Sequence, residues 1–372
     1  MIPVCDLAPA HVKAIAAYQP GKPTSELARE LDLDEANIVK LASNENPLGA
    51  SPAAISAVQK ILSGVALYPD GSGYDFKSAL MKKYGVAREQ IVLGNGSNDV
   101  LELAGRAFLT ANDSAVFSQH AFAVYPLTVQ AIGAKSIEVS AKDFAHDLPA
   151  MVSGIRDDTR VVFVANPNNP TGTFAKADEL LAFIKAIPEN VLIVLDEAYT
   201  EYLPAPLKFD TIAWLKQFPN LLISRTLSKA YGLAGLRVGF GLGHPAVIDM
   251  INRIRQPFNV NSLALAAAEA ALNDDAFLAK SAENNRLGLQ QLAAGFDRLG
   301  LKFIPSFGNF ICVKVGDAAA MFQFLLRQGV IVRPVAGYGM PRHLRISVGL
   351  PKQNDRCLEA LAEGLKQVSA NR

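Results

Sequence analysis

Short runs of apolar, often β-branched residues alternate with longer amphipathic stretches through the middle of the 372-residue chain. Apolar runs bounded by Gly, Asn, Asp or Pro are typical of strands that are buried on both faces. Such runs predict strands that begin at Ile91, Ala115, Ser136, Val161, Val191, Leu221 and Leu236. Helix-like stretches follow Ser97 and Ala175. This alternation predicts an α/β fold with a mostly parallel sheet covered by helices.

The pattern changes beyond about residue 255, where two long helical stretches come first. Strand-like runs follow, which read FICVKV, VIVRPV and LRISVGL, with a helical stretch between the first two and a last helix after Pro351. This region is typical of a smaller α+β domain. The N-terminal segment is rich in loop residues, so the pattern leaves open which domain it packs against. We place the domain boundaries near residues 47 and 255.

Composition and charge narrow the classes of protein. Half of the residues are apolar, which allows a sizeable core, and the net charge is +1. A balanced charge argues against a nucleic-acid binder that relies on a basic field. The three cysteines, Cys5, Cys312 and Cys357, lie far apart in the sequence. That spacing does not fit a disulfide framework and indicates a reducing compartment.

Typical targeting and metal-binding motifs are missing from the sequence. The chain begins MIPVCDLAPAHVKA, which lacks the basic start and the long apolar run of a signal peptide. No stretch approaches the roughly 18 apolar residues of a membrane-spanning helix. The five histidines are scattered, without an HExxH pair or a cysteine–histidine group. The sequence therefore predicts a cytoplasmic protein with no membrane partner and no metal site.

Polar groups follow several predicted strands, at the places where functional residues gather in open α/β sheets. The first such stretch, LGNGSNDVLEL at residues 93–103, places two glycines between a strand and a helix that begins near Ser97. A helix N-terminus offers free N–H groups and a positive dipole end, which suits a phosphate, although a simple capped helix fits equally well. Asp99 stands where a dinucleotide fingerprint needs its last glycine, and no Walker GK[ST] follows.

Two further strand ends carry amides and carboxylates. ANPNNPTG, at residues 165–172, brings Asn168 and Asn169 to a strand end, although its prolines and glycine favour a simple turn. VLDEAYTEY, at residues 194–202, brings Asp196 and Glu197 to the end of an apolar strand. A carboxylate in that position is costly unless it has a cationic partner, and a helix N-cap is the alternative interpretation.

The stretch RTLSKAYGLAGLRVGF holds Lys229 among small and apolar residues, and Arg237 follows eight residues later. Burying an ammonium group without a partner is costly, so a lysine here indicates a specific role. A phosphate cradle, an amide, a buried carboxylate, and a lysine beside a hydroxyl and an arginine are together what pyridoxal phosphate (PLP) requires.

These motifs, in this order, resemble the fold-type I PLP-dependent aminotransferases, in the branch that contains histidinol-phosphate aminotransferase. The motifs of the resemblance run nearly end to end: AYQPGKP, VKLASNENPLG, YPDG, LGNGSND, AFAVYP, NPNNPTG, DEAY, TLSKAYGLAGLRVGF and HLRISVG. The resemblance implies a large PLP domain at residues 48–255, with a mostly parallel seven-stranded sheet sandwiched by helices. Residues 1–47 and 256–372 would form the smaller α+β domain. The active site would lie at a homodimer interface.

The resemblance assigns three residues to catalysis. Lys229 would form the Schiff base with PLP and move a proton, Asp196 would pair with the pyridine nitrogen, and Tyr199 would hydrogen-bond the phenolic oxygen. The other cofactor contacts within the chain would come from Ser97, Asn98, Phe122, Asn169, Thr226, Ser228 and Arg237. Tyr68 of the partner subunit would reach the phosphate, so a dimer would be needed for a complete site.

The resemblance also points to substrate-binding residues. Arg345 in HLRISVG would bind the α-carboxylate of glutamate, because a planar guanidinium matches a carboxylate. The phosphate of histidinol phosphate would need the same region, with help from Arg333 and Tyr18. Asn44 would line the site. For Arg333, a salt-bridged surface arginine is the alternative interpretation.

The reaction implied is transamination of L-histidinol phosphate with 2-oxoglutarate, which gives imidazole-acetol phosphate and L-glutamate. An aromatic amino-acid aminotransferase and a threonine-phosphate decarboxylase on the same scaffold are the alternatives. His120 and Ala121 stand where the family often carries Pro-Thr, and the loop before Arg345 is short. The choice between imidazole and aromatic substrates is therefore left open by the sequence.

Overall fold

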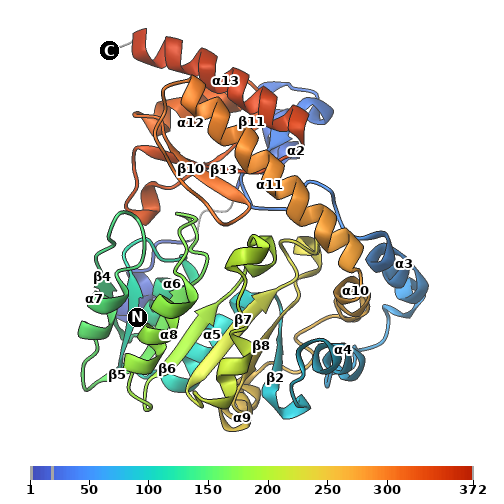
Figure 1. Cartoon of the computed structure of the whole chain (residues 1–372), viewed down its shortest axis with the longest axis vertical. Helices are drawn as coiled ribbons and strands as arrows, with labels where there is room; N and C mark the ends of the chain where they lie inside the picture. Colours follow the sequence, from blue (N-terminus) through green and yellow to red (C-terminus); the bar gives the residue numbers. More distant parts are fainter. Residues whose placement is uncertain (1–2, 18–20, 371–372) are drawn as a thin grey trace.

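The computed structural model describes residues 3–17 and 21–370. A large α/β unit and a smaller unit follow one another along the long axis of the molecule (Figure 1). The large unit is built on a seven-stranded sheet, whereas the small unit contains a four-stranded sheet and a separate pair of strands. This division positions a pocket between the two units.

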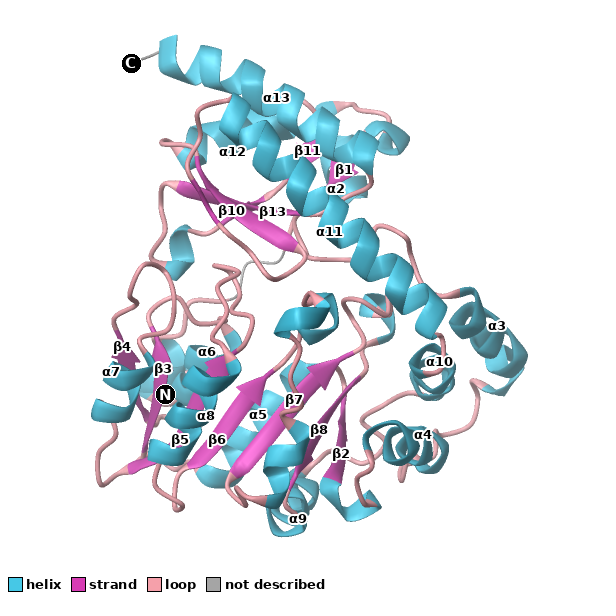
Figure 2. Cartoon of the chain, in the orientation of Figure 1, coloured by secondary structure: helices cyan, strands magenta, loops and turns pink. Residues whose placement is uncertain are grey.

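The large sheet has the strand order β2-β8-β7-β6-β5-β3-β4 (Figure 2). Its strands are β2 (Ile91–Gly94), β3 (Ser114–Ser118), β4 (Lys135–Val139), β5 (Thr159–Ala165), β6 (Leu192–Asp196), β7 (Leu221–Thr226) and β8 (Gly239–Gly243). β8 runs antiparallel to β2 and β7, and the other pairs are parallel. The predicted mostly parallel, seven-stranded sheet is confirmed. The parallel strands β5, β6 and β7 bring their carboxyl ends to one edge, where ligands bind in such sheets.

Helices cover both faces of this sheet. They are α3 (Pro52–Ile61), α4 (Tyr74–Tyr84), α5 (Ser97–Phe108), α6 (Val124–Ile132), α7 (Leu148–Ser153), α8 (Ala177–Ala186), α9 (Pro245–Ile254) and α10 (Ser262–Leu272). Val162 and Ile193 belong to the core shared with α8 and α10, whereas Val161 and Val194 belong to the core shared with α5 and α9. Successive strand residues point to opposite faces, so a sheet covered on both sides requires continuous apolar runs.

The small unit combines early and late segments of the chain. Its elements are α2 (Thr24–Leu31), β1 (Val39–Lys40), α11 (Asp275–Arg298), β9 (Phe303–Ile304), β10 (Phe310–Lys314), α12 (Ala318–Arg327), β11 (Val330–Ile331), β12 (Arg333–Pro334), η9 (Ala336–Tyr338), β13 (His343–Ser347) and α13 (Pro351–Ala370). β1 pairs in parallel with β11. Leu27 of α2 packs with Leu326 and Ile331. The structure therefore places α2 and β1 in the small unit, which the sequence pattern left open.

Two details go beyond the sequence pattern. The run VIVRPV is not one strand, because β11 pairs with β1 whereas β12 pairs with β13 in the four-stranded sheet. The run is divided because two different sheets each take part of it. Helix α10 lies beyond residue 255, yet it packs on α3 and contributes alanines to the core of the large unit. The domain division at residue 255 stays a prediction.

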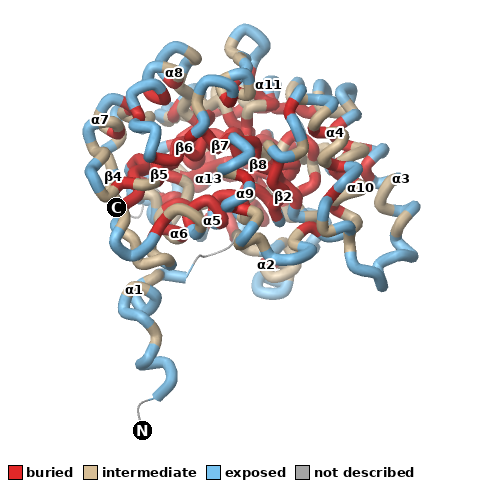
Figure 3. Tube along the Cα trace, turned by 90° about the horizontal axis from the view of Figure 1, so that it is seen from below, coloured by how far each residue is buried: buried red, intermediate tan, exposed pale blue. Residues whose placement is uncertain are grey.

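The N-terminal segment, with η1 (Val4–Leu7) and α1 (Ala10–Lys13), projects from the body of the molecule (Figure 3). The imidazole of His11 lies against Gly133, which follows α6. None of the helices in residues 3–17 and 21–370 is both long enough and apolar enough to cross a bilayer. Across those two ranges, no three His, Cys, Asp or Glu side chains are grouped as metal ligands would be.

Candidate active site

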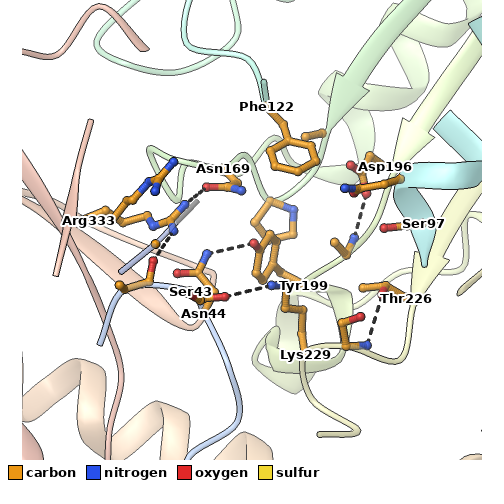
Figure 4. Close-up of a pocket in the computed structure, with 18 of the residues that line it drawn as sticks. Ser43, Asn44, Ser97, Phe122, Asn169, Asp196, Tyr199, Thr226, Lys229 and Arg333 are labelled. Atoms are coloured by element: carbon orange, nitrogen blue, oxygen red, sulfur yellow. Dashed lines mark hydrogen bonds between the residues drawn. The ribbon is translucent and has the colours of Figure 1, made fainter. Parts of the chain in front are cut away.

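A pocket lies between the carboxyl edge of the large sheet and the small unit (Figure 4). The predicted site residues that line it are Asn44, Ser97, Asn98, Phe122, Asn169, Asp196, Tyr199, Thr226, Ser228, Lys229, Arg237, Arg333 and Arg345. Figure 4 shows Asp196, Ser97 and Thr226 on one side of the pocket. Arg333 lies on the opposite side. Tyr68 is outside the pocket, and Tyr18 lies outside the described residues.

Asp196 is the last residue of β6 and is 4% exposed. Its Oδ2 accepts a hydrogen bond from the Tyr125 hydroxyl at 2.7 Å, and its Oδ1 accepts one from the Ala198 N–H at 3.2 Å. Burial raises the pKa of this carboxyl to about 6, and the two hydrogen bonds oppose that rise. A cation beside the carboxylate, such as a protonated ring nitrogen, would favour its charged form further.

Glu197, the next residue, has a different environment. Its carboxylate accepts hydrogen bonds from Arg225 Nε at 2.9 Å and Nη2 at 2.7 Å, and from the Thr211 hydroxyl at 2.7 Å. Successive residues of an extended chain point in opposite directions, so only one of the two acids faces the pocket. The sequence predicts both acids at the strand end. In the structure, Glu197 forms a buried ion pair with Arg225, whereas Asp196 lines the pocket.

Lys229 lies in the turn that follows β7, and its Nζ donates a hydrogen bond to the Ser43 carbonyl at 3.3 Å. Burial, together with the nearby cations Arg345 and Arg237, lowers the pKa of Lys229 to about 8. A lower pKa leaves more of the amine neutral near physiological pH. A neutral amine is both a nucleophile and a base, so this position suits covalent attachment of an aldehyde and proton transfer.

The N-terminus of α5 lies beside Arg237. Gly96 precedes the helix with a φ of +78°, and a Cβ on it would lie 2.4 Å from Nη2 of Arg237. A Cβ on Gly239 in β8 would lie 2.5 Å from the backbone nitrogen of Ser97. The two glycines therefore allow a guanidinium and a helix N-terminus to meet. Both groups attract anions, so this end of the pocket suits a phosphate.

Two hydroxyl side chains and an aromatic ring border this phosphate-suited end. Ser228 Oγ accepts a hydrogen bond from Arg237 Nη1 at 3.4 Å, and the Ser228 N–H donates to Thr226 Oγ1 at 3.1 Å. The half-buried ring of Phe122 lies edge-on to Tyr125, with 5.9 Å between ring centroids. The pocket thus has an anion-binding end beside a flat apolar wall.

Tyr199 and Asn44 form a fixed pair at the floor of the pocket. The Tyr199 hydroxyl accepts a hydrogen bond from Asn44 Nδ2 at 3.0 Å, and burial raises the pKa of Tyr199 to about 12. The hydroxyl therefore stays protonated and can donate to a ligand. Asn44 has a φ of +54°, which is uncommon for a residue other than glycine. The Ser347 hydroxyl holds it there by accepting from the Asn44 N–H at 2.8 Å and donating to its Oδ1 at 2.9 Å.

Arg345 and Arg333 bring two guanidiniums to the end of the pocket formed by the small unit. Arg345 donates through Nη1 to Asn169 Oδ1 at 2.6 Å and through Nη2 to the Ala42 carbonyl at 2.8 Å. Its Nε is buried without a hydrogen-bond partner in the described part of the chain. Arg333 faces Arg345 across the antiparallel pair of β12 and β13. Directly opposed residues share one face, and both guanidiniums line the pocket, where their charge suits an anionic substrate.

The structure of one chain leaves the predicted role of Tyr68 in the partner subunit untested, and it adds residues that the sequence did not predict. Tyr68 is 84% exposed, and its ring stacks on Phe258 with centroids 4.8 Å apart. One chain alone therefore does not bring Tyr68 to the site. Ser43, Tyr125 and Tyr338 contact or line the site but were not predicted. Tyr125 lies in the same AFAVYP motif as Phe122. A buried tyrosine hydroxyl usually needs a hydrogen-bond partner, so its place in this motif was a signal that it contacts the site.

Comparison with known proteins shows which family the chain is similar to. The sequence model of the family "Aminotransferase class I and II" matches residues 36–361. Histidinol-phosphate aminotransferase 2 of Nitrosospira multiformis is 58% identical over 364 residues, which cover 98% of this chain and 93% of the relative. Histidinol-phosphate aminotransferase 1 of Thiobacillus denitrificans is 62% identical over 358 residues, which cover 96% of this chain and 93% of the relative.

Solved structures agree with the sequence relatives. Histidinol-phosphate aminotransferase from Sinorhizobium meliloti, solved in complex with pyridoxal-5'-phosphate, superposes with a TM-score of 0.89 at 28% identity, covering 96% of this chain and 97% of that one. An aspartate aminotransferase from Thermus thermophilus shows the same fold, with a TM-score of 0.82 at 23% identity and coverage of 96% and 99%. The predicted fold-type I aminotransferase architecture is confirmed. The chain belongs to the class I and II aminotransferase family, and within it to the histidinol-phosphate aminotransferases.

Proposed function

We propose that the protein exchanges an amino group between L-histidinol phosphate and 2-oxoglutarate, giving imidazole-acetol phosphate and L-glutamate. The observation that carries this proposal is the meeting of Asp196, Lys229 and Arg237 in a pocket whose other end holds Arg333 and Arg345. The first three residues suit a phosphorylated aldehyde cofactor, and the last two suit a substrate with anionic groups. The printed names of the relatives supply the substrate.

Pyridoxal phosphate fits the residues of the pocket, because a phosphate-suited helix end, a buried carboxylate and an amine surround one cavity. When bound, this cofactor supplies an electron sink for the bond that breaks at the substrate Cα. Asp196 would pair with the ring nitrogen, and Tyr199 with Asn169 would hydrogen-bond the phenolic oxygen. The remaining contacts would come from Ser97, Asn98, Phe122, Thr226, Ser228 and Arg237.

Lys229 would serve the reaction in two ways. Its Nζ would hold the cofactor covalently until the substrate amine takes its place, and it would then move the proton at the substrate Cα. The pKa of about 8 supports both roles, because an appreciable neutral fraction exists near pH 7. The hydrogen bond to the Ser43 carbonyl keeps the amine in the pocket while it is free.

Arg345 would bind the α-carboxylate of glutamate, because its guanidinium is already held by Asn169 and Ala42 and its buried Nε has no hydrogen-bond partner among the described residues. L-Histidinol phosphate carries its phosphate in place of that carboxylate. Arg333 would therefore share the phosphate with Arg345, and Asn44 would line the same end. Tyr18 would help Arg333 to bind the phosphate; this role is proposed from the sequence alone, because Tyr18 lies outside the described residues.

We include a homodimer in the proposal. Tyr68 of the partner subunit would reach the phosphate of the cofactor, and the high exposure of Tyr68 in one chain supports a role outside its own pocket. The cytoplasmic location and the absence of nucleic-acid partners stay predictions. The substrates are small molecules.

The experiment that tests the function measures amino transfer with the purified, PLP-loaded protein. We expect L-histidinol phosphate to support formation of L-glutamate from 2-oxoglutarate, and Lys229→Ala to lower the rate by at least about a thousandfold, since a covalent nucleophile and a base are lost together. The control is Lys280→Ala, which removes a lysine of α11 that does not line the pocket.

Other substrates decide between the alternatives on the same scaffold. Much faster turnover of phenylalanine than of L-histidinol phosphate would identify an aromatic aminotransferase, and release of carbon dioxide from threonine phosphate would identify a decarboxylase. Either result would contradict the proposed substrate. Retention of full activity by Lys229→Ala would contradict the proposed site itself.

A further inference from the structure

Three aromatic rings connect the large and small units next to Tyr338, which lines the pocket. His120 follows β3, Phe144 lies in the loop between β4 and α7, and His343 is the first residue of β13. The ring centroids of His120 and Phe144 are 5.7 Å apart in a stacked arrangement, and those of Phe144 and His343 are 5.4 Å apart and edge-on. We call these residues the ring cluster. It joins two large-unit loops to the strand that carries Arg345.

His120 also makes a hydrogen bond across the two units. Its Nδ1 lies 2.6 Å from the backbone carbonyl of Tyr338. A carbonyl oxygen only accepts, so His120 must carry a proton on Nδ1 and donate it. His120 is 7% exposed, and its own carbonyl accepts a hydrogen bond from Asn168 Nδ2 at 3.0 Å. The imidazole is therefore a fixed donor anchored to the turn after β5.

The segment held by this bond forms part of the pocket. Tyr338 ends the 3₁₀ turn η9 and lines the pocket together with Arg333 and Arg345. Gly339 follows with a φ of +73°, and a Cβ on it would lie 3.6 Å from Cε1 of His120. The imidazole thus packs against the turn as well as bonding to it. The turn that carries Tyr338, beside the two arginines in the pocket lining, is therefore bonded to a residue of the other unit.

The loop that carries Phe144 is held in an unusual backbone conformation. Phe144 has a φ of +65°, and Asp143 before it has a φ of +49°. Bulky residues rarely adopt such values, and they persist only where the surroundings hold them. Here Lys142 and Ala145 exchange backbone hydrogen bonds of 3.0 and 2.8 Å across the turn. The strain is consistent with a requirement to place the Phe144 ring against His120.

We propose that His120 is a positioning residue for substrate binding, because its Nδ1–H holds the Tyr338 turn at the correct distance from Arg333 and Arg345. This inference rests on the proposed function, and it adds a residue to the recognition of the phosphorylated substrate. His120 does not line the pocket, whereas Asp196 and Lys229 do. Its loss should therefore weaken substrate binding without slowing the bond-breaking step.

Two substitutions separate the hydrogen bond from the ring packing. His120→Asn keeps a donor, because the amide nitrogen of Asn occupies nearly the place of Nδ1, whereas His120→Phe keeps an aromatic ring without a donor. We expect His120→Phe to raise the KM for L-histidinol phosphate roughly three- to tenfold at nearly unchanged kcat, as the loss of one hydrogen bond predicts. His120→Asn should bring the KM back toward that of the wild type.

A second measurement uses hydrogen–deuterium exchange in the PLP-loaded protein. The amides of Tyr338, Gly339 and Met340 donate within the turn, to Val335 and Ala336 carbonyls. His120→Phe should speed exchange in residues 335–340, with exchange in α12 unchanged, and His120→Asn should not. If the Phe variant is not recovered in folded form, His120→Leu serves in its place.

Several results would overturn the role of His120. They are a wild-type KM in His120→Phe, a His120→Asn variant no better than His120→Phe, or a fall in kcat with no change in KM. Failure of the wild type to use L-histidinol phosphate would instead refute the proposed function. In that case hydrogen exchange still tests whether His120 holds the turn.

Discussion

A tyrosine hydroxyl sets the environment of the buried carboxylate at the centre of the site. Tyr125 is 1% exposed, stacks on Phe163 with centroids 4.9 Å apart, and donates to Asp196 Oδ2 at 2.7 Å. Burial and the neighbouring carboxylate raise the pKa of Tyr125 well above its ordinary value, so it remains a donor. The hydrogen bond stabilises the charged form of Asp196 and lowers a pKa that burial has raised.

Replacement of Tyr125 by Phe should shift the pH dependence of activity. Without the hydroxyl, the pKa of Asp196 rises further, so the carboxylate becomes charged only at higher pH. The acid limb of kcat/KM should therefore move to higher pH, with a loss of roughly tenfold near pH 6 and a smaller loss above pH 8. Rates measured with L-histidinol phosphate across this pH range check the prediction.

Tyr202→Phe is the matched control for Tyr125→Phe. Tyr202 is also a buried tyrosine, but it packs with Ala230 and Phe310 and does not line the pocket. This control should cost stability without moving the acid limb. An equal shift in both variants, or no shift in Tyr125→Phe, would mean that the hydroxyl of Tyr125 does not control the ionisation of Asp196.

At the scale of elements, the phosphate-suited end forms where the backbones of β2 and β8 come close to the N-terminus of α5. β2 ends at Gly94, where a Cβ would lie 2.7 Å from the Gly96 carbonyl, and β8 begins at Gly239 against the first residue of α5. Side chains at these positions would separate the strands from the helix end. The glycines thus allow the N-terminus of α5 to lie beside Arg237.

Gly96→Ala should weaken cofactor binding. The added Cβ would collide with Arg237 Nη2 at 2.4 Å and push the guanidinium away from the helix end. The affinity of the apoprotein for PLP should fall by about tenfold or more, as expected for loss of a charge-assisted contact. An absorbance titration of the apoprotein with PLP measures this affinity.

Gly316→Ala separates backbone strain from that collision. Gly316 also has a positive φ, of +84°, but a Cβ there would meet nothing within 4 Å. This variant should lose about 1 kcal/mol of stability and keep the wild-type affinity for PLP. Equal affinities in the two variants would show that the collision with Arg237 does not weaken PLP binding.

The strands of the large unit were predictable because a buried parallel strand is a short apolar run with turn residues at both ends. All seven runs of the large sheet became strands in the structure. VIVRPV failed as a single strand for a reason that no local pattern contains. Its first half meets β1 from the N-terminal segment, and its second half meets β13. Strand boundaries there depend on partners far away in the sequence.

At the scale of the whole molecule, an apolar segment remains uncovered in the single chain. Its exposed side chains are Ile55, Leu62, Val65, Leu67, Tyr68 and Tyr74. They follow one another from α3 to the start of α4, at the edge of the large unit (Figure 1). Clustered exposed apolar residues are typical of protein interfaces. This segment therefore supports the proposed homodimer, in which Tyr68 serves the site of the partner subunit.

Mixed dimers made with two affinity tags test whether Tyr68 acts across the interface. A dimer of one Lys229→Ala chain and one Tyr68→Phe chain should hold one native site and show about half of the wild-type activity. A dimer of one doubly substituted chain and one wild-type chain should hold none, and show only the reduced activity of a site that lacks the Tyr68 hydroxyl. The two dimers have identical composition, so each serves as the control for the other.

The reverse order of activities would show that Tyr68 completes the site of its own chain. A protein that stays monomeric and fully active would contradict the shared site as well. Sedimentation of the wild type over a range of concentrations settles the assembly before the mixed dimers are compared.

The sequence by itself determined the fold class, the family and the residue types of the pocket. Those features depend on local patterns, because strand periodicity and turn residues bring Asp196, Lys229 and the glycines before α5 to the same edge of a sheet. Only the tertiary structure decided that Asp196 contacts Tyr125, that Glu197 pairs with Arg225, and that Arg333 lies opposite Arg345. Such pairings join separate elements, and packing of whole units sets the distances between them.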